Sequence, residues 1–110
     1  MKKFTSFILL LLTVTVINYP NPFNPHSGGI TTFESTADQS LEAVVYIYDM
    51  SARLCWQKNF SLGGGTTSRT TWDGYTNANE LASNGVYLYR VVDQSTRKSL
   101  AKGKIWIVNQ

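Results

Sequence analysis

Cysteine and histidine are almost missing from this sequence, which has one residue of each, Cys55 and His26. A single cysteine rules out an internal disulfide and a cysteine-rich metal site. A nucleophilic triad needs a serine or cysteine, a histidine and a carboxylate in mutual reach, and the one histidine lies in a proline- and glycine-rich stretch. The sequence therefore predicts a protein that is not an enzyme and that uses no cofactor.

Charge is also scarce, because only 15% of the 110 residues are charged. The net charge of +3 includes Lys2 and Lys3, and without these two lysines it is +1. So small a positive charge gives no support for a nucleic-acid partner. The seven acidic residues are scattered, and nothing in their spacing favours a catalytic carboxylate pair over ordinary surface charge.

The chain has no apolar run as long as the roughly 20 residues that a membrane-spanning helix needs. It does begin with Met1-Lys2-Lys3 and the shorter apolar run Phe4 to Ile17. A charged start before a short apolar run is typical of a secretory signal peptide, so we assign residues 1–17 to a signal peptide or apolar leader. A truncated anchor or an N-terminal β-strand remains an alternative, and a membrane would be contacted only through this leader.

All three prolines of the protein fall between residues 20 and 25. Proline fixes φ and lacks an N–H, and it favours extended conformations in the residue before it. Residues 18–29 are therefore expected to form an extended, irregular arm. Tyr19 and Phe23 are expected to hold this arm against the rest of the domain.

Alternating apolar and polar residues dominate the remainder, residues 30–110, and indicate β-strands joined by short turns. In the strongest run, Leu41 to Asp49, apolar residues occupy both faces, which predicts a central strand covered on each side. Trp72 is expected to be a core plug, with tight turns at Asp73-Gly74 and Asn84-Gly85. Together the runs predict an all-β fold, an immunoglobulin/fibronectin III-like antiparallel β-sandwich of about seven strands. The expected strands are residues 30–35, 41–49, 53–62, 66–72, 85–93 and 97–108.

Two groups of polar residues are weak candidates for binding sites. Asp73, Asn77 and Asn79 place oxygen atoms at alternating positions, as in a calcium loop, but the acidic density of an EF-hand is missing. We therefore expect no metal, and expect Asp73 to cap its own turn, with Gly74 at positive φ. A basic group near the C-terminus could meet an anionic glycolipid or a receptor groove, or could protect a sheet edge from aggregation. Its members are Arg97, Lys98, Lys102 and Lys104.

Five short motifs, taken in order and spacing, resemble the C-terminal sorting domain of type IX secretion cargo and the immunoglobulin-like domain of the flagellar hook-capping protein. They are Tyr19-Pro20-Asn21-Pro22-Phe23-Asn24-Pro25, Ile47-Tyr48-Asp49 with Arg53, Trp72-Asp73-Gly74, Ser83-Asn84-Gly85-Val86-Tyr87-Leu88-Tyr89-Arg90, and Lys102-Gly103-Lys104-Ile105. The chain departs from the family at Ala52, where the family usually has glycine before the arginine, and this predicts a different turn geometry.

The resemblance implies an immunoglobulin-like domain without catalytic residues, attached behind a secreted passenger and recognised by outer-membrane secretion machinery. It implies a secreted or outer-surface location in a bacterium, reached through the periplasm. The expected partners are the secretion machinery or neighbouring surface proteins, with an anionic surface glycolipid as a further candidate. The alternative is a structural or adhesive domain of a surface or flagellar hook-capping assembly.

Overall fold

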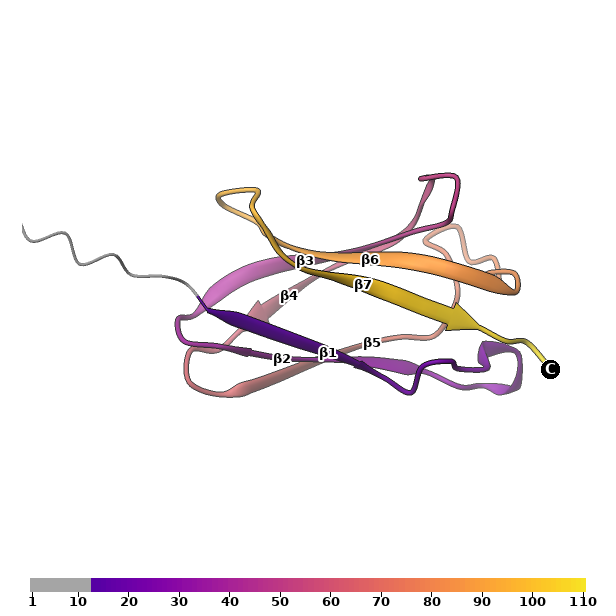
Figure 1. Ribbon diagram of the computed structural model, residues 1–110, viewed down its shortest axis with the longest axis horizontal. Helices are drawn as coiled ribbons and strands as arrows, with labels where there is room; N and C mark the ends of the chain where they lie inside the picture. The colour runs from indigo at the N-terminus through magenta and orange to yellow at the C-terminus, as the bar shows by residue number, and fades with distance from the viewer. Residues whose placement is uncertain (1–12) are drawn as a thin grey trace, which may run out of the picture.

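In a computed structural model of the chain, residues 13–110 are described, and they form seven β-strands and one short 3-10 helix (Figure 1). The predicted all-β sandwich of about seven strands is confirmed. The strands are β1 (Val14–Tyr19), β2 (Thr31–Ala37), β3 (Leu41–Tyr48), β4 (Leu54–Leu62), β5 (Thr67–Trp72), β6 (Gly85–Asp93) and β7 (Ser99–Ile107), and the helix is η1 (Pro25–Ser27).

The strands form two antiparallel sheets that face each other. One sheet has three strands in the order β1-β2-β5, and the other has four in the order β4-β3-β6-β7. Consecutive strands pair at β1-β2, β3-β4 and β6-β7, while β2 to β3, β4 to β5 and β5 to β6 cross between the sheets. This alternation of hairpins and crossings is typical of antiparallel sandwiches.

The core lies between the sheets and is filled by every second residue of the strands, as the period-two pattern predicts. One face of β3 is fully buried together with the inward residues of β6 and β7 in the same sheet, and Phe33 and Trp72 of the three-stranded sheet close the other side. The ring of Tyr89 meets that of Phe33 edge-on, with centroids 5.1 Å apart, and burial raises the pKa of the Tyr89 hydroxyl. The inward side chains of these three strands are Ala43, Val45, Ile47, Tyr87, Tyr89, Val91, Ile105 and Ile107.

The opposite face of β3 does not match its prediction. Val44 is buried among its neighbours, but Tyr46 and Tyr48 keep part of their surface exposed. The sandwich has two layers, so the outer face of the four-stranded sheet has no third layer over it within residues 13–110. A strand that is central within its sheet is therefore covered on one face only, and the prediction of cover on both faces was wrong.

The N-terminal part of the described chain differs from the expected division at residue 17. Residues 14–17 lie in β1, which pairs antiparallel with β2 from Val14↔Ala37 to Tyr19↔Thr32. Val14 and Val16 pack against the core while Thr15 and Ile17 are exposed, so a period-two strand lies inside what reads as one apolar run. Residues 1–12 lie outside the described part, and the signal peptide remains a prediction. Within residues 13–110 no helix has the length and apolar character needed to cross a membrane.

Candidate functional site

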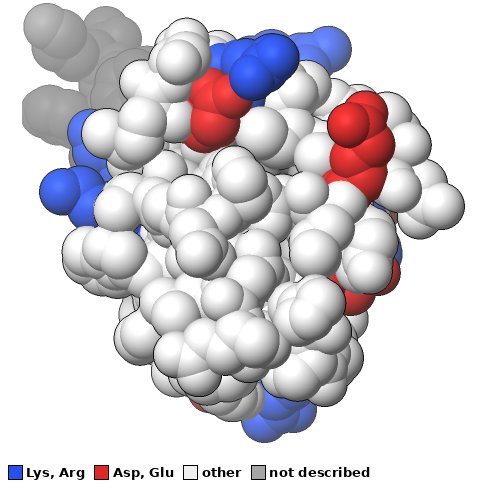
Figure 2. Space-filling model, turned by 90° about the vertical axis from the view of Figure 1, so that its right-hand side faces the viewer, with Lys and Arg blue, Asp and Glu red and all other residues white. Residues whose placement is uncertain are grey.

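Four of the five motifs that carried the resemblance meet at one end of the sandwich, and the fifth, Lys102 to Ile105, lies within β7. This end, called the motif end below, is built by residues 20–27 of the arm, the β3-β4 turn (residues 49–53) and the β5-β6 loop (residues 73–84). Figure 2 looks onto this end and shows charged groups mainly at its rim, with an uncharged surface in the middle. Such a surface suits recognition by contact and shape more than by charge.

The arm closes part of the free edge of β7. The Phe23 N–H donates to the Trp106 carbonyl at 3.1 Å, and the Val108 N–H donates to the Phe23 carbonyl at 3.0 Å. The Phe23 ring is buried in the core, as expected. Tyr19 is not: 42% of it is exposed, and its hydroxyl donates to the Glu34 carboxylate at 2.8 Å on the sheet surface. Only one of the two aromatics therefore anchors the arm.

Trp72 ties the arm, the β5-β6 loop and both sheets together. It is only 1% exposed, as expected of a core plug, and its indole N–H donates to the Tyr75 carbonyl at 2.9 Å. Its ring lies 5.7 Å from Phe23, 5.9 Å from Trp56 and 6.0 Å from Tyr87, measured between centroids. Aromatic groups at this spacing stabilise one another beyond their area burial.

The turn after Trp72 has the predicted chemistry. Oδ1 of Asp73 accepts the N–H of Tyr75 at 3.0 Å, and Gly74 has φ +84°. A Cβ at position 74 would overlap the ring of Pro25, so glycine is needed there for contact with the arm as well as for φ. The Gly74 carbonyl accepts the Ala82 N–H at 2.8 Å, which fixes the other end of the loop.

The weak calcium candidates have structural roles in this loop. Oδ1 of Asn77 accepts the N–H of Gln57 on β4 at 2.8 Å, and Asn79 has left-handed backbone with φ +62°. The carboxylate of Asp73 caps its own turn, as expected. In the described part of the chain, no three His, Cys, Asp or Glu side chains cluster where they could hold a metal ion.

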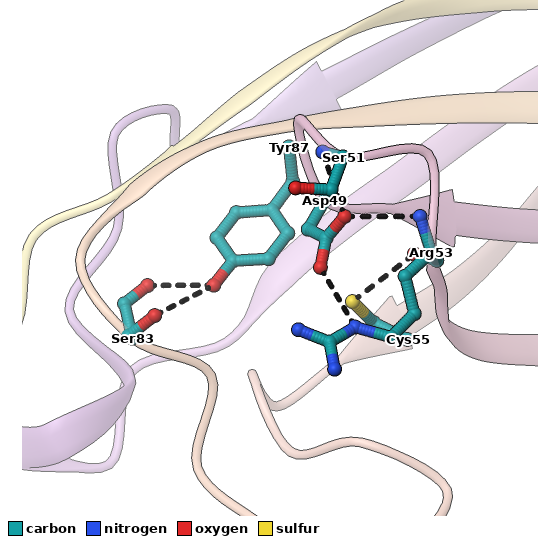
Figure 3. A network of polar contacts seen from close by, with 6 residues as sticks. All are labelled: Asp49, Ser51, Arg53, Cys55, Ser83 and Tyr87. Atoms are coloured by element: carbon teal, nitrogen blue, oxygen red, sulfur yellow. Dashed lines mark hydrogen bonds and ion pairs between the residues drawn. The ribbon is translucent and has the colours of Figure 1, made fainter.

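A hollow of about 590 Å³ lies beside the β3-β4 turn, and the sequence reasoning did not find it. Figure 3 shows the polar groups near it. The Asp49 carboxylate accepts the N–H groups of Arg53 at 3.0 Å and Ser51 at 2.9 Å, and its Oδ2 lies 3.1 Å from Nε of Arg53. These hydrogen bonds, led by that from the Arg53 backbone, hold the pKa of Asp49 below its usual value. The signal in the sequence was the acid at the start of a turn with arginine four residues later.

Ala52 in this turn has φ +64°, the left-handed conformation that glycine favours. Ala52 thus keeps the backbone conformation that glycine would adopt at this position. The expected change in turn geometry is not seen in the φ of Ala52. Cys55 follows at the start of β4 and is partly buried, and burial raises the pKa of its thiol. It therefore stays protonated near neutral pH, as expected of a cysteine that acts as a small hydrophobe.

The basic residues do not belong to the motif end as a group. Arg97 and Lys98 lie in the β6-β7 turn at the other end of these strands, whereas Lys102 and Lys104 lie on the outer face of β7. The structure thus splits the predicted basic surface into a turn and a strand face. Of the two, only the outer face of β7, with Lys102 and Lys104, has neighbouring groups that suggest a binding site.

No protein-family model matches the chain, and no curated protein matches it. Among solved structures, it is similar to part of dimeric latent PorU from Porphyromonas gingivalis, with a TM-score of 0.78 and 26% identity over 94% of this chain. PorZ, an essential bacterial surface component of the type-IX secretion system of the same organism, follows with a TM-score of 0.59 and 23% identity over 86% of this chain. The chain spans about a tenth of each, 10% of PorU and 11% of PorZ.

A β-glucosidase from Listeria innocua has a TM-score of 0.51 at 12% identity, over 88% of this chain and 16% of that one. So low an identity shows a common sandwich fold and nothing about function.

Proposed function

We propose that this chain is a non-catalytic recognition domain of the type IX secretion kind, which directs a protein to the bacterial surface. The observation that carries the proposal is the match to PorU, which covers 94% of this chain at a TM-score of 0.78. PorZ, a surface component of the type-IX secretion system, supports the same assignment through its fold.

The motif end supports the proposal because four of the five matching motifs meet there in space. Phe23, Trp72 and Tyr87 come from three separate motifs and form one buried aromatic cluster. The cluster fixes the arm, the turn and the loop around it, so the surface that these segments share is held rigid. A preformed surface keeps the entropic cost of recognition low.

The test is a reporter carrying residues 13–110 at its C-terminus, exported to the periplasm of a bacterium that has type IX secretion. The proposal predicts the reporter on the cell surface, and in the periplasm of a strain that lacks this system. A folded reporter domain that stays in the periplasm of the competent strain would overturn the proposal.

Two matched double variants make the test specific for the motif end. Met50→Glu with Ala78→Glu places two charges on exposed positions of that end, and Gln39→Glu with Gln94→Glu does the same at the opposite end. Export should fall for the first pair and persist for the second, with both variants folded by circular dichroism. Equal export of both pairs would show that recognition does not use the motif end.

The alternative function, a structural or adhesive domain, stays a prediction and is tested by a separate measurement. A domain that assembles with copies of itself should form a stable oligomer in light scattering, whether or not it is exported.

A further inference from the structure

The outer face of the four-stranded sheet carries an ordered set of apolar and basic side chains. The antiparallel register places Tyr48, Leu88 and Lys104 in one row across β3, β6 and β7. The next row is Tyr46, Arg90 and Lys102. Every second residue of a strand points to the same side, and the intervening residues fill the core, so these six side chains point away from it.

Apolar surface is open in the middle of this face. The rings of Tyr46 and Tyr48 stack with centroids 6.2 Å apart, and Leu88 is 36% exposed. A groove of about 500 Å³ runs over Tyr48 and Leu88 and is bordered by Arg90, Lys102 and Lys104. An open apolar groove rimmed by polar groups is typical of an interaction site.

The charged side chains that border the groove, Arg90, Lys102 and Lys104, are all positive. Glu42 lies farther along the same face of β3, where its carboxylate accepts a hydrogen bond from the Ser61 hydroxyl at 2.8 Å. Arg90 lies directly opposite Lys102, a like-charged cross-strand pair, which is unfavourable in an isolated sheet. The ion pairs among residues 13–110 are Asp49–Arg53 and Glu34–Arg69, and neither includes Arg90, Lys102 or Lys104. An anionic partner would relieve this repulsion.

Part of the edge of β7 beside the same face has backbone groups without a hydrogen-bond partner in the described residues. The carbonyl of Lys104 and the backbone groups of Trp106 bond to the arm, so they point away from β6. In an antiparallel strand, the N–H and C=O of one residue point to the same side, and successive residues alternate between the two sides. Both backbone groups of Lys102 and the N–H of Lys104 therefore also point away from β6. They have no hydrogen-bond partner among residues 13–110, because the arm bonds only to the C-terminal half of this edge and β1, which packs close to β7, pairs with β2.

We propose that this face and the open edge of β7 at Lys102 bind an extended acidic segment of a partner protein. Its backbone would pair with Lys102 and Lys104, and its carboxylates would lie along the lysines and Arg90. A membrane or a nucleic acid would use the charge and the rings but would leave the strand edge unpaired, so the edge favours a polypeptide. The proposal goes beyond the sorting role and does not depend on it.

The test uses the folded chain and a fluorescein-labelled synthetic peptide of alternating glutamate and threonine. Amide hydrogen exchange by NMR should be fast at Lys102 and Lys104 in the free protein and at least about tenfold slower with the peptide. Gly103 is the internal control, since its backbone faces β6 and should be protected in both states.

Charge variants separate this site from general attraction. Lys102→Glu with Lys104→Glu should weaken peptide binding at least about tenfold, and the milder Lys102→Gln with Lys104→Gln should weaken it less, both with unchanged circular dichroism. Lys58→Glu with Lys98→Glu makes the same change in net charge elsewhere and should alter binding less than about twofold.

Three results would overturn the proposal. The peptide methylated at alternate backbone nitrogens could bind as well as the parent peptide, which would remove the strand edge from the site. The two glutamate pairs could weaken binding equally. Phosphatidylglycerol vesicles or oligodeoxythymidine could shift the signals of this face while the peptide does not, which would assign the face to a lipid or a nucleic acid.

Discussion

Asn21 is joined to Trp106 as if the two were residues of neighbouring strands. Oδ1 of Asn21 accepts the N–H of Trp106 at 2.9 Å, and its Nδ2 donates to the Lys104 carbonyl at 2.7 Å. The residues on both sides of Asn21 are prolines, which have no N–H to give. The side-chain amide therefore supplies both the donor and the acceptor that a strand backbone would.

Replacing Asn21 with Ala should lower the free energy of unfolding by about 1–2 kcal/mol, because two hydrogen bonds are lost. Asn21→Asp keeps the acceptor for Trp106 but loses the donor to the Lys104 carbonyl, so it should also destabilise. Urea denaturation measures both. Gln39→Ala, at an exposed position, is the control and should stay within about 0.5 kcal/mol of the parent.

Trp72→Ala should cost about 3–5 kcal/mol, because a buried ring and its contacts with three aromatics are lost. Trp72→Phe should cost less, since it keeps much of the packing and loses the hydrogen bond to Tyr75. Trp106→Ala is the comparison, because that ring is 46% exposed and should cost about 1 kcal/mol or less. Equal losses for the two alanine variants in chemical denaturation would contradict the assignment of Trp72 to the core.

Gly74→Ala should destabilise by about 2–4 kcal/mol, from left-handed strain together with overlap on Pro25. Gly65→Ala is a matched control, since Gly65 has φ +75° and a Cβ there would meet no atom within 4 Å. It should cost only about 1 kcal/mol. Thermal denaturation of the pair isolates the contact between turn and arm. If the two costs are the same, Gly74 serves the turn and not the arm.

Ala52→Gly should raise the free energy of unfolding by about 1 kcal/mol, because alanine is strained at φ +64° and glycine is not. Most single substitutions destabilise, so a gain at this position would be informative. The measurement is the urea midpoint. A loss of stability would show that the strain at Ala52 is smaller than the chain entropy that glycine adds.

Asp93 should make stability depend on pH in the acid range. Its carboxylate accepts hydrogen bonds from the hydroxyl and the N–H of Ser95, both at 2.9 Å, and these keep the pKa of Asp93 below the ordinary value of 3.8. A lowered pKa in the folded state adds stability above the unfolded pKa, and this is lost as the pH falls through the folded value.

Asp93→Asn should therefore be less stable than the parent at pH 7, and the difference should shrink below about pH 4. Urea denaturation at pH 7 and pH 3 measures this, and Ser95→Ala should show the same trend more weakly. A difference that does not change with pH would contradict the assignment.

The strands could be predicted from the sequence because each carries a local period-two pattern. Ala43, Val45 and Ile47 identify their own face without knowledge of any other strand. β1 was predicted only as an alternative, because Val14 and Val16 alternate inside an apolar run that is equally consistent with a leader. The partial exposure of Tyr46 and Tyr48 could not be predicted, because apolar residues on both faces of a strand do not show how many layers the fold has.

The way in which the arm is held could not be predicted, since its partners lie far away in the chain. The burial of Phe23 could be predicted, because it is a large apolar residue among prolines. Nothing local to Asn21 points to Lys104 or Trp106, or to the half of the β7 edge that stays open. The acceptor role of Asp73 was predictable, because that hydrogen bond closes within two residues.

The bonds between the arm and β7 also set the order in which this domain can fold. Asn21 is 83 residues from Lys104 and 85 from Trp106, so its two hydrogen bonds to β7 can form only after that last strand has been synthesised. Contacts so distant in sequence place the domain among the slower folders of its size, in milliseconds to seconds. The arm precedes β2 in the chain but is locked in place by β7, so the domain cannot complete its fold until its last strand is present.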